Sequence, residues 1–126
     1  DKNSKKNKED ESEEIEITTL DNFVKRNKIK NVNFIKCDVE GFELSVFNGA
    51  RKTLKRFNPL VFVEIEERHT KKYGINPQQV LDFFKKLDYK SYSIKKDKIE
   101  KIDKIITEKP LYIFSKKELN KSSQSF

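Results

Sequence analysis

Residues 33–54 read NFIKCDVEGFELSVFNGARKTL, and they contain the most informative change of pattern in this sequence. The apolar run Val32–Asp38 predicts a strand, and the amphipathic run Phe42–Phe57 predicts a helix. An Asp, a Glu and a Gly stand together between the two. A glycine at such a junction permits a sharp turn or a close backbone approach to a ligand, and ligands of open parallel sheets lie beyond the carboxyl ends of strands.

The sequence around this stretch predicts further strands and helices. Ile15–Thr19 alternates apolar and polar residues, as a short strand does. Thr19 is a suitable cap for a helix that continues to about Lys28. Leu60–Glu66 opens with four consecutive apolar residues, which is typical of a strand that is covered on both faces.

The second half of the chain continues the alternation. Asn76 and Pro77 predict the start of a helix whose buried stripe is formed by Val80, Leu81, Phe84 and Leu87. Tyr89–Ile94 and Leu111–Ser115 predict two more strands, separated by a charged loop. The resulting order predicts an α/β fold with a mostly parallel sheet, helices on its faces and an antiparallel last strand.

Composition restricts the class of protein. The formal net charge is +7, but only 4 of the 28 basic residues are Arg and the lysines are spread along the chain. Arg is preferred for bidentate recognition of phosphates and bases, so we interpret most lysines as solvated surface and nucleic acid as an unlikely partner. No apolar run reaches the roughly 18–20 residues that a membrane crossing needs. The single cysteine, Cys37, suits a reducing compartment, and we expect a cytoplasmic protein.

The ends of the chain differ from its middle. Asp1–Glu14 contains no apolar residue, so we expect a disordered charged arm or loop there. Residues 15–115 carry the predicted domain, and residues 116–126 are expected to form a flexible tail. Because the sequence begins with Asp rather than Met, we expect it to be part of a longer protein.

Four acids and one histidine are expected at one rim of the sheet. Asp38 and Glu40 follow one predicted strand, Glu64 and Glu66 end the next, and His69 comes shortly after. Simpler interpretations stay open for each of them. Acids before a helix are favoured by capping and by the helix dipole, acids at a strand end can mark its exit to solvent, and a lone His is often a surface residue.

This sequence resembles the FkbM-type methyltransferase family. The similarity lies in TTLDNF (residues 18–23), in residues 33–54 and in PLVFVEIE (residues 59–66), and KLDYKSYSI (residues 86–94) fits the remainder. The most specific part is the string K-x-D-V-E-G-x-E, formed here by Lys36, Asp38, Val39, Glu40, Gly41 and Glu43. The resemblance covers about residues 15–115.

The resemblance implies a Rossmann-like sheet of seven strands in the order 3-2-1-4-5-7-6, with the seventh antiparallel. It also implies binding of S-adenosylmethionine and methylation of a hydroxyl, on a sugar or a secondary metabolite. The Gly-rich turn and the ribose-binding acid of the family are absent from this chain. The chain therefore matches the later half of the domain, from the end of strand three to strand seven, and we expect it to be marginally stable without an N-terminal half that binds most of the cofactor.

The resemblance also implies roles for the residues at this rim of the sheet. We expect Asp38 and Glu40 to be catalytic, Glu64 and His69 to face the substrate, and Asp38 and Gly41 to contact the cofactor. A variant mechanism has Asp38 and Glu64 holding a divalent cation, and it is not favoured. Two other hypotheses stay open: a non-catalytic basic module that binds nucleic acid or another anionic polymer, and a structural remnant of a decayed or split gene.

Overall fold

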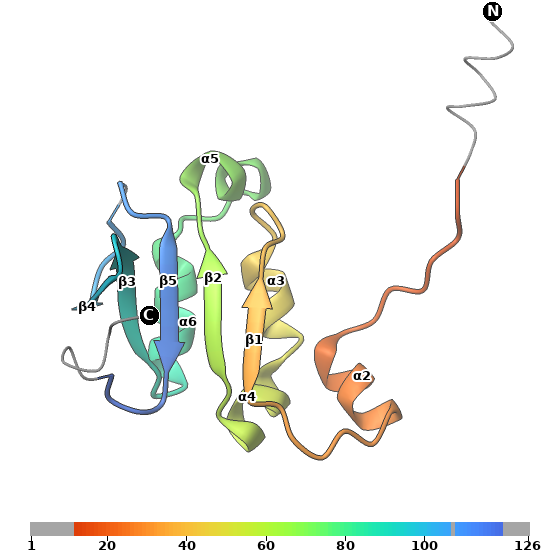
Figure 1. The fold of residues 1–126 in the computed structure, drawn as a ribbon. Coiled ribbons are helices and arrows are strands. Elements are labelled where there is room, and N and C mark those ends of the chain that lie inside the picture. Colours follow the sequence, from red (N-terminus) through yellow and green to blue (C-terminus); the bar gives the residue numbers. More distant parts are fainter. Residues whose placement is uncertain (1–11, 107, 120–126) are drawn as a thin grey trace, which may run out of the picture.

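The computed structural model describes residues 12–106 and 108–119, which form one mixed sheet with three of the helices packed on one face (Figure 1). The strands are β1 Phe34–Cys37, β2 Leu60–Glu64, β3 Lys90–Lys95, β4 Lys98–Ile102 and β5 Leu111–Ser115. The helices are α2 Leu20–Arg26, α3 Glu43–Asn48, α4 Arg51–Phe57, α5 Glu67–Thr70, α6 Gln78–Lys86 and a 3-10 turn at Lys71–Tyr73. None of these helices has the length and apolar character that a membrane crossing requires.

The five strands lie in the order β1-β2-β5-β3-β4. Only the pairing of β1 with β2 is parallel among the described strands, and β5 pairs antiparallel with both β2 and β3, while β3 and β4 form an antiparallel hairpin. The expectation of a mostly parallel sheet is therefore wrong. β1, β2 and β3 do run in one direction, but β5 enters between β2 and β3 and replaces a parallel pairing by two antiparallel ones.

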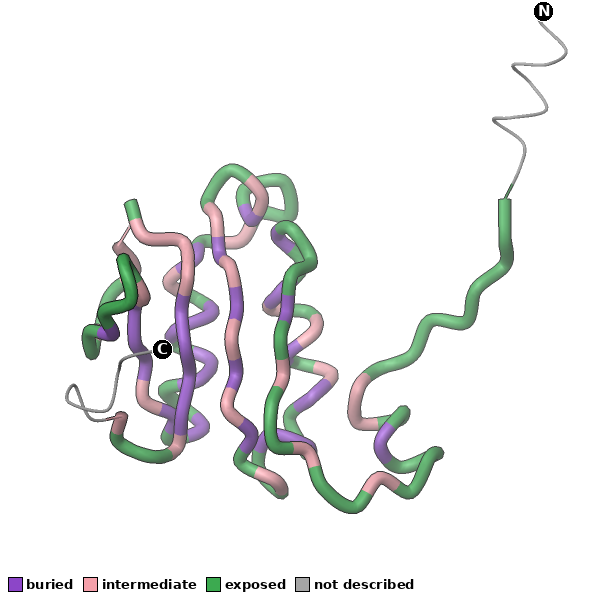
Figure 2. Tube along the Cα trace, viewed as in Figure 1, coloured by how far each residue is buried: buried purple, intermediate pink, exposed green. Residues whose placement is uncertain are grey.

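The core lies between the sheet and the helices α3, α4 and α6 (Figures 1 and 2). Phe84 of α6 stacks on Phe114 of β5 with ring centroids 4.0 Å apart, and it also meets Phe47 and Tyr89 edge to face. Phe83 is buried in the same core, whereas Tyr92 is buried in a second, smaller cluster with Ile99 and Ile113. These aromatic residues therefore contribute to packing.

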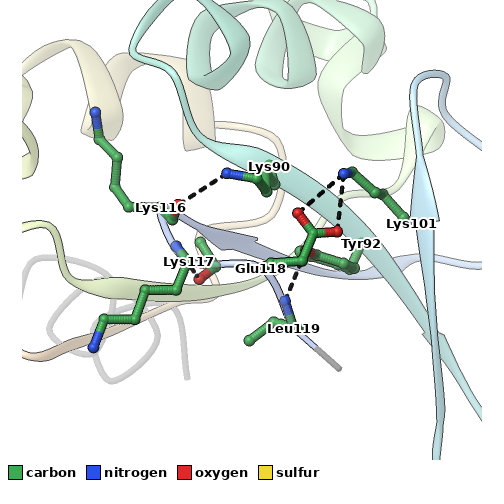
Figure 3. A network of polar contacts seen from close by, with 8 residues as sticks. Lys90, Tyr92, Lys101, Lys116, Lys117, Glu118 and Leu119 are labelled. Carbon is green, nitrogen blue, oxygen red and sulfur yellow. Dashed lines mark hydrogen bonds and ion pairs between the residues drawn. The ribbon is translucent and has the colours of Figure 1, made fainter. Parts of the chain in front are cut away.

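The opposite face of the sheet carries no helix within the described residues. Residues 116–119 lie against part of it (Figure 3): the Leu119 N–H donates to the Tyr92 hydroxyl at 2.9 Å, and Glu118 pairs with Lys101 at 3.0 Å. β1 is the edge strand at the end of the sheet away from β4, and its Phe34 is 52 % exposed. The parts of the predicted arm and tail at residues 1–11 and 120–126 lie outside the described residues.

The helix predicted over residues 42–57 is divided into α3 and α4 at Gly49 and Ala50. A Cβ on Gly49 would lie 3.0 Å from the Thr19 side chain, so the glycine lets α2 approach the break. The Asp21 carboxylate of α2 then accepts hydrogen bonds from the backbone N–H groups of Lys52 and Thr53, at 3.1 and 2.8 Å. A side chain of α2 thus caps α4, whose own preceding residue, Ala50, has no side chain that can do so.

The N-terminal part of the described chain corrects one prediction and confirms another. Residues 12–19 contain no strand, and Ile15 and Ile17 are 75 % and 90 % exposed. A strand needs a neighbour that pairs with its backbone, and no described strand lies beside this segment. The predicted cap at Thr19 is confirmed, because its hydroxyl accepts from the Asn22 N–H at 3.1 Å.

The start of α6 is also confirmed. The Gln78 N–H donates to the Asn76 side chain at 2.9 Å, and the Asn76 N–H donates to the Gln79 side chain at 2.8 Å. These two bonds form the reciprocal capping box that the sequence predicted. They fix the point at which the chain leaves the turns after β2 and begins to cover the sheet.

Candidate active site

Parallel pairing brings the carboxyl ends of β1 and β2 to one rim of the sheet. The last residues in register are Cys37 and Val63, so Asp38 and Glu64 come next, side by side. A pocket of about 110 Å³ opens between them. Its lining consists of Asp38, Glu40, Gly41, Glu64, Glu66, Arg68 and His69. The structure thus brings together all the rim residues that the sequence singled out, and we call this set the acid rim.

The loop after β1 forms a tight turn. The Phe42 N–H donates to the Val39 carbonyl at 3.3 Å, and the two central residues, Glu40 and Gly41, have φ values of 45° and 104°. Extended structure ends at Cys37. Asp38 and Glu40 therefore do not share a face through strand alternation. The turn, rather than a continued strand, brings both to the pocket.

Gly41 is placed by its contact with the neighbouring loop. A Cβ at this position would lie 2.3 Å from the carbonyl oxygen of His69 and 2.5 Å from its carbonyl carbon. Only a residue without a side chain allows that approach. The close approach observed at this glycine is made to the loop after β2, whereas the sequence predicted an approach to a ligand, which stays a prediction. The two loops that carry the acid rim are in direct contact.

Glu43 is a buried carboxyl that sequence reasoning left without a role. Its side chain is 0 % exposed, and its Oε2 accepts a hydrogen bond from the Gly41 N–H at 2.9 Å. Oε1 has no hydrogen-bond partner among the described residues. Burial raises the pKa of Glu43, against the opposing effect of backbone N–H donors such as that of Gly41. The sequence signal that could have identified Glu43 is its position as an acid in the first turn of a helix, directly after a turn that contains a glycine.

The helix-capping interpretation of Asp38 and Glu40 finds no support. The residue that precedes α3 is Phe42, and no side chain makes a capping hydrogen bond there. Both acids are exposed at the pocket. The capping part of that interpretation is thus not supported, and the helix-dipole part stays open.

The loop after β2 concentrates charge on one side of the pocket. The Glu66 carboxylate contacts Arg68, and its Oε2 lies 3.6 Å from Nε2 of His69. A hydrogen bond between the carboxyls of Glu64 and Glu66 raises the pKa of Glu64, which burial and the charges of Glu66 and Asp38 raise further. The same bond, together with Arg68, lowers the pKa of Glu66. Glu64 is therefore the acid of this pair that holds a proton more firmly.

Two further observations concern metal ligands and nucleophiles at and beside the rim. Over residues 12–106 and 108–119, no three Asp, Glu, His or Cys side chains are grouped so that they could hold a metal ion. Cys37 is 5 % exposed, and burial, with the charges of Glu43 and Asp38, raises the pKa of its thiol to about 12. A thiol with such a pKa is a poor nucleophile at neutral pH, so we interpret Cys37 as a packing residue.

Comparison with known proteins identifies the family. The model of the methyltransferase FkbM domain matches residues 1–91, so it begins before the region of resemblance seen in the sequence and ends within β3. Searches of curated proteins and of solved structures gave no match. Since the family model covers well over half of the 126 residues and includes the entire acid rim, the chain belongs to the FkbM methyltransferase family.

Proposed function

We propose that this chain carries the acceptor-binding and proton-accepting part of a methyltransferase that moves a methyl group from S-adenosylmethionine to a hydroxyl of a glycan or small molecule. One observation carries the proposal: Asp38 and Glu64, at the ends of adjacent parallel strands, line a single pocket. Family membership supplies the class of reaction. We infer that the methyl acceptor is a hydroxyl, because the carboxylates that line the pocket could accept the proton that a hydroxyl releases.

The arrangement of the strands supports this proposal. β1, β2, β5 and β3 lie in that spatial order, with β5 reversed relative to the other three. This is the order implied by the family resemblance for the fourth, fifth, seventh and sixth strands. On this assignment the acid rim lies beyond the carboxyl ends of the fourth and fifth strands, where open α/β sheets bind their ligands.

The rim also fits the charge of the methyl donor. Its side chains include four carboxylates against one guanidinium and one imidazole. S-adenosylmethionine supplies a cationic sulfonium whose methyl group is the electrophile, and carboxylates nearby favour such a cation. We place Asp38 on the donor side, with Glu40 and Gly41 shaping the turn. The residues that hold the rest of the cofactor belong to an N-terminal half of the domain.

Glu64 is the residue best suited to take the proton of the acceptor. As the acceptor oxygen bonds to the methyl carbon and the carbon–sulfur bond breaks, the hydroxyl proton must move to a base. The pKa of Glu64 is raised by Glu66 and by burial, which makes its carboxylate a stronger base than an ordinary Glu. His69 lies beside the pair and is placed to contact the acceptor.

The outer edge of β1 indicates where the N-terminal half would join. Within the described residues β1 has a strand partner on one side only, and Phe34 is largely exposed there. Unpaired strand edges with exposed apolar residues are sites of strand addition. We propose that a further strand of the same domain pairs with β1 and carries the cofactor turn. The cytoplasmic location stays a prediction that rests on Cys37 and on sequence composition.

A transfer assay tests the assignment. The full domain, which is this chain together with the N-terminal half that is expected to bind most of the cofactor, is given S-adenosylmethionine with a labelled methyl group and a panel of sugars and hydroxylated small molecules. Cofactor binding is measured separately by calorimetry. We expect Glu64→Gln to lower turnover by roughly a hundredfold or more while cofactor binding persists. Glu67→Gln, at an exposed residue of α5 outside the pocket, is the matched control and should change neither quantity. Unchanged turnover in Glu64→Gln would refute the role of Glu64, and absence of cofactor binding would refute the function.

A further inference from the structure

A second charged feature lies at the other end of β1, where that strand begins. A groove of about 410 Å³ is lined by residues of α2, of the loop after it and of α4. Its charged lining comprises five cations and one carboxylate: Lys25, Lys28, Lys30, Lys52, Arg56 and Asp21. We call it the basic groove. None of its lining residues belongs to the acid rim.

The cations of the basic groove are not neutralised by the described part of the protein. All five are exposed, and none forms an ion pair with a carboxylate within residues 12–106 and 108–119. Asp21 is the only acid in the lining, and its carboxylate is held by two backbone N–H groups of α4 and by the Thr53 hydroxyl at 2.7 Å. The groove therefore concentrates positive charge that lacks a counter-charge.

The shape of the groove suits a small ligand. The lining also contains apolar residues: Val24 is buried, and Ile29 and Phe57 are half-buried. The Arg56 guanidinium lies over the Phe57 ring, 4.9 Å from its centroid. The volume falls within the range of roughly 300–1,000 Å³ that is common for small-molecule sites.

We propose that the basic groove binds a small molecule that carries two or more phosphate groups. Lysine binds phosphate as a point charge, and several lysines around one concave site favour a ligand whose negative charges are closely spaced. A nucleic acid is less favoured, because only one Arg lines the groove and base recognition relies on Arg. The site goes beyond the proposed methyl transfer, since it lies at the opposite end of β1 from the acid rim.

Titration calorimetry with inorganic tripolyphosphate tests the proposal. The groove variant is Lys30→Glu with Lys52→Glu. Lys52 occupies the first turn of α4, where a carboxylate is favoured by the helix dipole, and Lys30 lies outside the helices and strands, so the fold should persist. The matched control is Lys95→Glu with Lys98→Glu on the β3–β4 hairpin, which changes the net charge equally at another lysine cluster.

We expect the groove variant to bind tripolyphosphate at least about tenfold more weakly and the control to bind within about twofold of the unmodified protein. Binding should also weaken as salt is added. Equal weakening in both variants would show that only overall charge matters and would overturn the proposal, as would an absence of binding. A short single-stranded RNA that binds through the groove more tightly than tripolyphosphate would overturn it in favour of a nucleic-acid site.

Discussion

The acid rim and the basic groove lie at opposite ends of β1, and they differ in whether their charged side chains are paired with one another. At the rim, Glu64, Glu66, Arg68 and His69 interact with one another, and the turn beneath them is fixed by a buried carboxyl. In the groove, the lysines extend into solvent without a carboxylate partner among the described residues. Groups that are fixed in position suit a reaction, which needs reacting atoms held in place, whereas exposed charges suit attraction of an anion. The contrast predicts where the molecule tolerates change.

The largest expected effect concerns the crowded contact beneath the rim. Gly41→Ala forces a Cβ to within 2.3 Å of the His69 carbonyl oxygen and holds alanine at a φ of 104°. We expect a loss of about 3 kcal/mol or more in the free energy of unfolding, measured by urea denaturation. Gly74→Ala is the matched control, because Gly74 also has a positive φ, of 67°, but its Cβ would meet nothing within 4 Å.

The control should cost only about 1–2 kcal/mol, which is the penalty of the left-handed conformation alone. The difference between the two variants then measures the contact between the two rim loops. Equal losses in both would show that the loops do not press on each other, and the rim would be no more rigid than the groove.

The next effect concerns the buried carboxyl. Glu43→Ala removes the acceptor of the Gly41 N–H and leaves a cavity, for an expected loss of about 2–3 kcal/mol. Because the pKa of Glu43 is raised in the folded protein above its ordinary value of 4.5, the folded state favours the protonated form. Stability gained from that proton is present at low pH and is lost as the pH rises from about the ordinary value through the folded pKa.

Glu43→Gln distinguishes charge from packing. Its amide oxygen can still accept from the Gly41 N–H, but it does not titrate. Unfolding measured as a function of pH should therefore lose the decline assigned to Glu43 while the fold is retained. A decline that persists in Glu43→Gln would assign the pH dependence to another group, such as the pair formed by Glu64 and Glu66.

A smaller effect is expected at the groove end. Asp21→Ala removes the cap that α2 gives to α4 and should lower stability by about 1–2 kcal/mol in thermal or chemical unfolding. Asp82→Ala on α6 is the control, since that exposed carboxylate makes a contact with Gln78 one helical turn away. Its expected cost is a few tenths of a kcal/mol. A negligible effect of Asp21→Ala would mean that α2 is loosely attached and that the groove lacks a fixed wall.

The last prediction concerns removal of divalent metal ions, which we expect to have no effect on turnover. Two carboxylates from neighbouring strands could in principle share a divalent cation, and the acid rim offers Asp38 and Glu64. We expect turnover of the protein to be unchanged when a chelator is added, with magnesium restored as the control. A loss of turnover that magnesium reverses would assign a metal to the rim. Asp38 and Glu64 would then be metal ligands.

Much of the acid rim could be predicted from local sequence, because its signals are local. The apolar runs around Phe34–Cys37 and Leu60–Glu64 identify two strands, and a parallel pairing places the residues after each strand at one edge. Glu43 and the contact between Gly41 and His69 could not be predicted. They depend on how two loops separated by more than twenty residues pack, and periodicity carries no information about that.

The missed elements have similar physical reasons. β4 has only Ile99 buried among charged residues, and its hairpin turn at Lys96 and Asp97 adopts positive φ values without a glycine, so neither the strand nor the turn had a recognisable signal. The division of the predicted helix at Gly49 depends on Asp21, which lies about thirty residues away. The parallel character of the sheet was overestimated because the alternation of strands and helices along the chain does not reveal that β5 inserts between β2 and β3. Only the strand order implied by the family resemblance contained that insertion.

The contact of Gly41 with His69 has a consequence for engineering. Two loops that touch through backbone atoms behave as one block, so an insertion in either would displace the other. Under the proposed methyl transfer, grafting a single loop in order to change the acceptor would misalign the recipient's own partner loop. Exchange of residues 38–43 together with residues 64–70, as one cassette, is the design that this geometry permits.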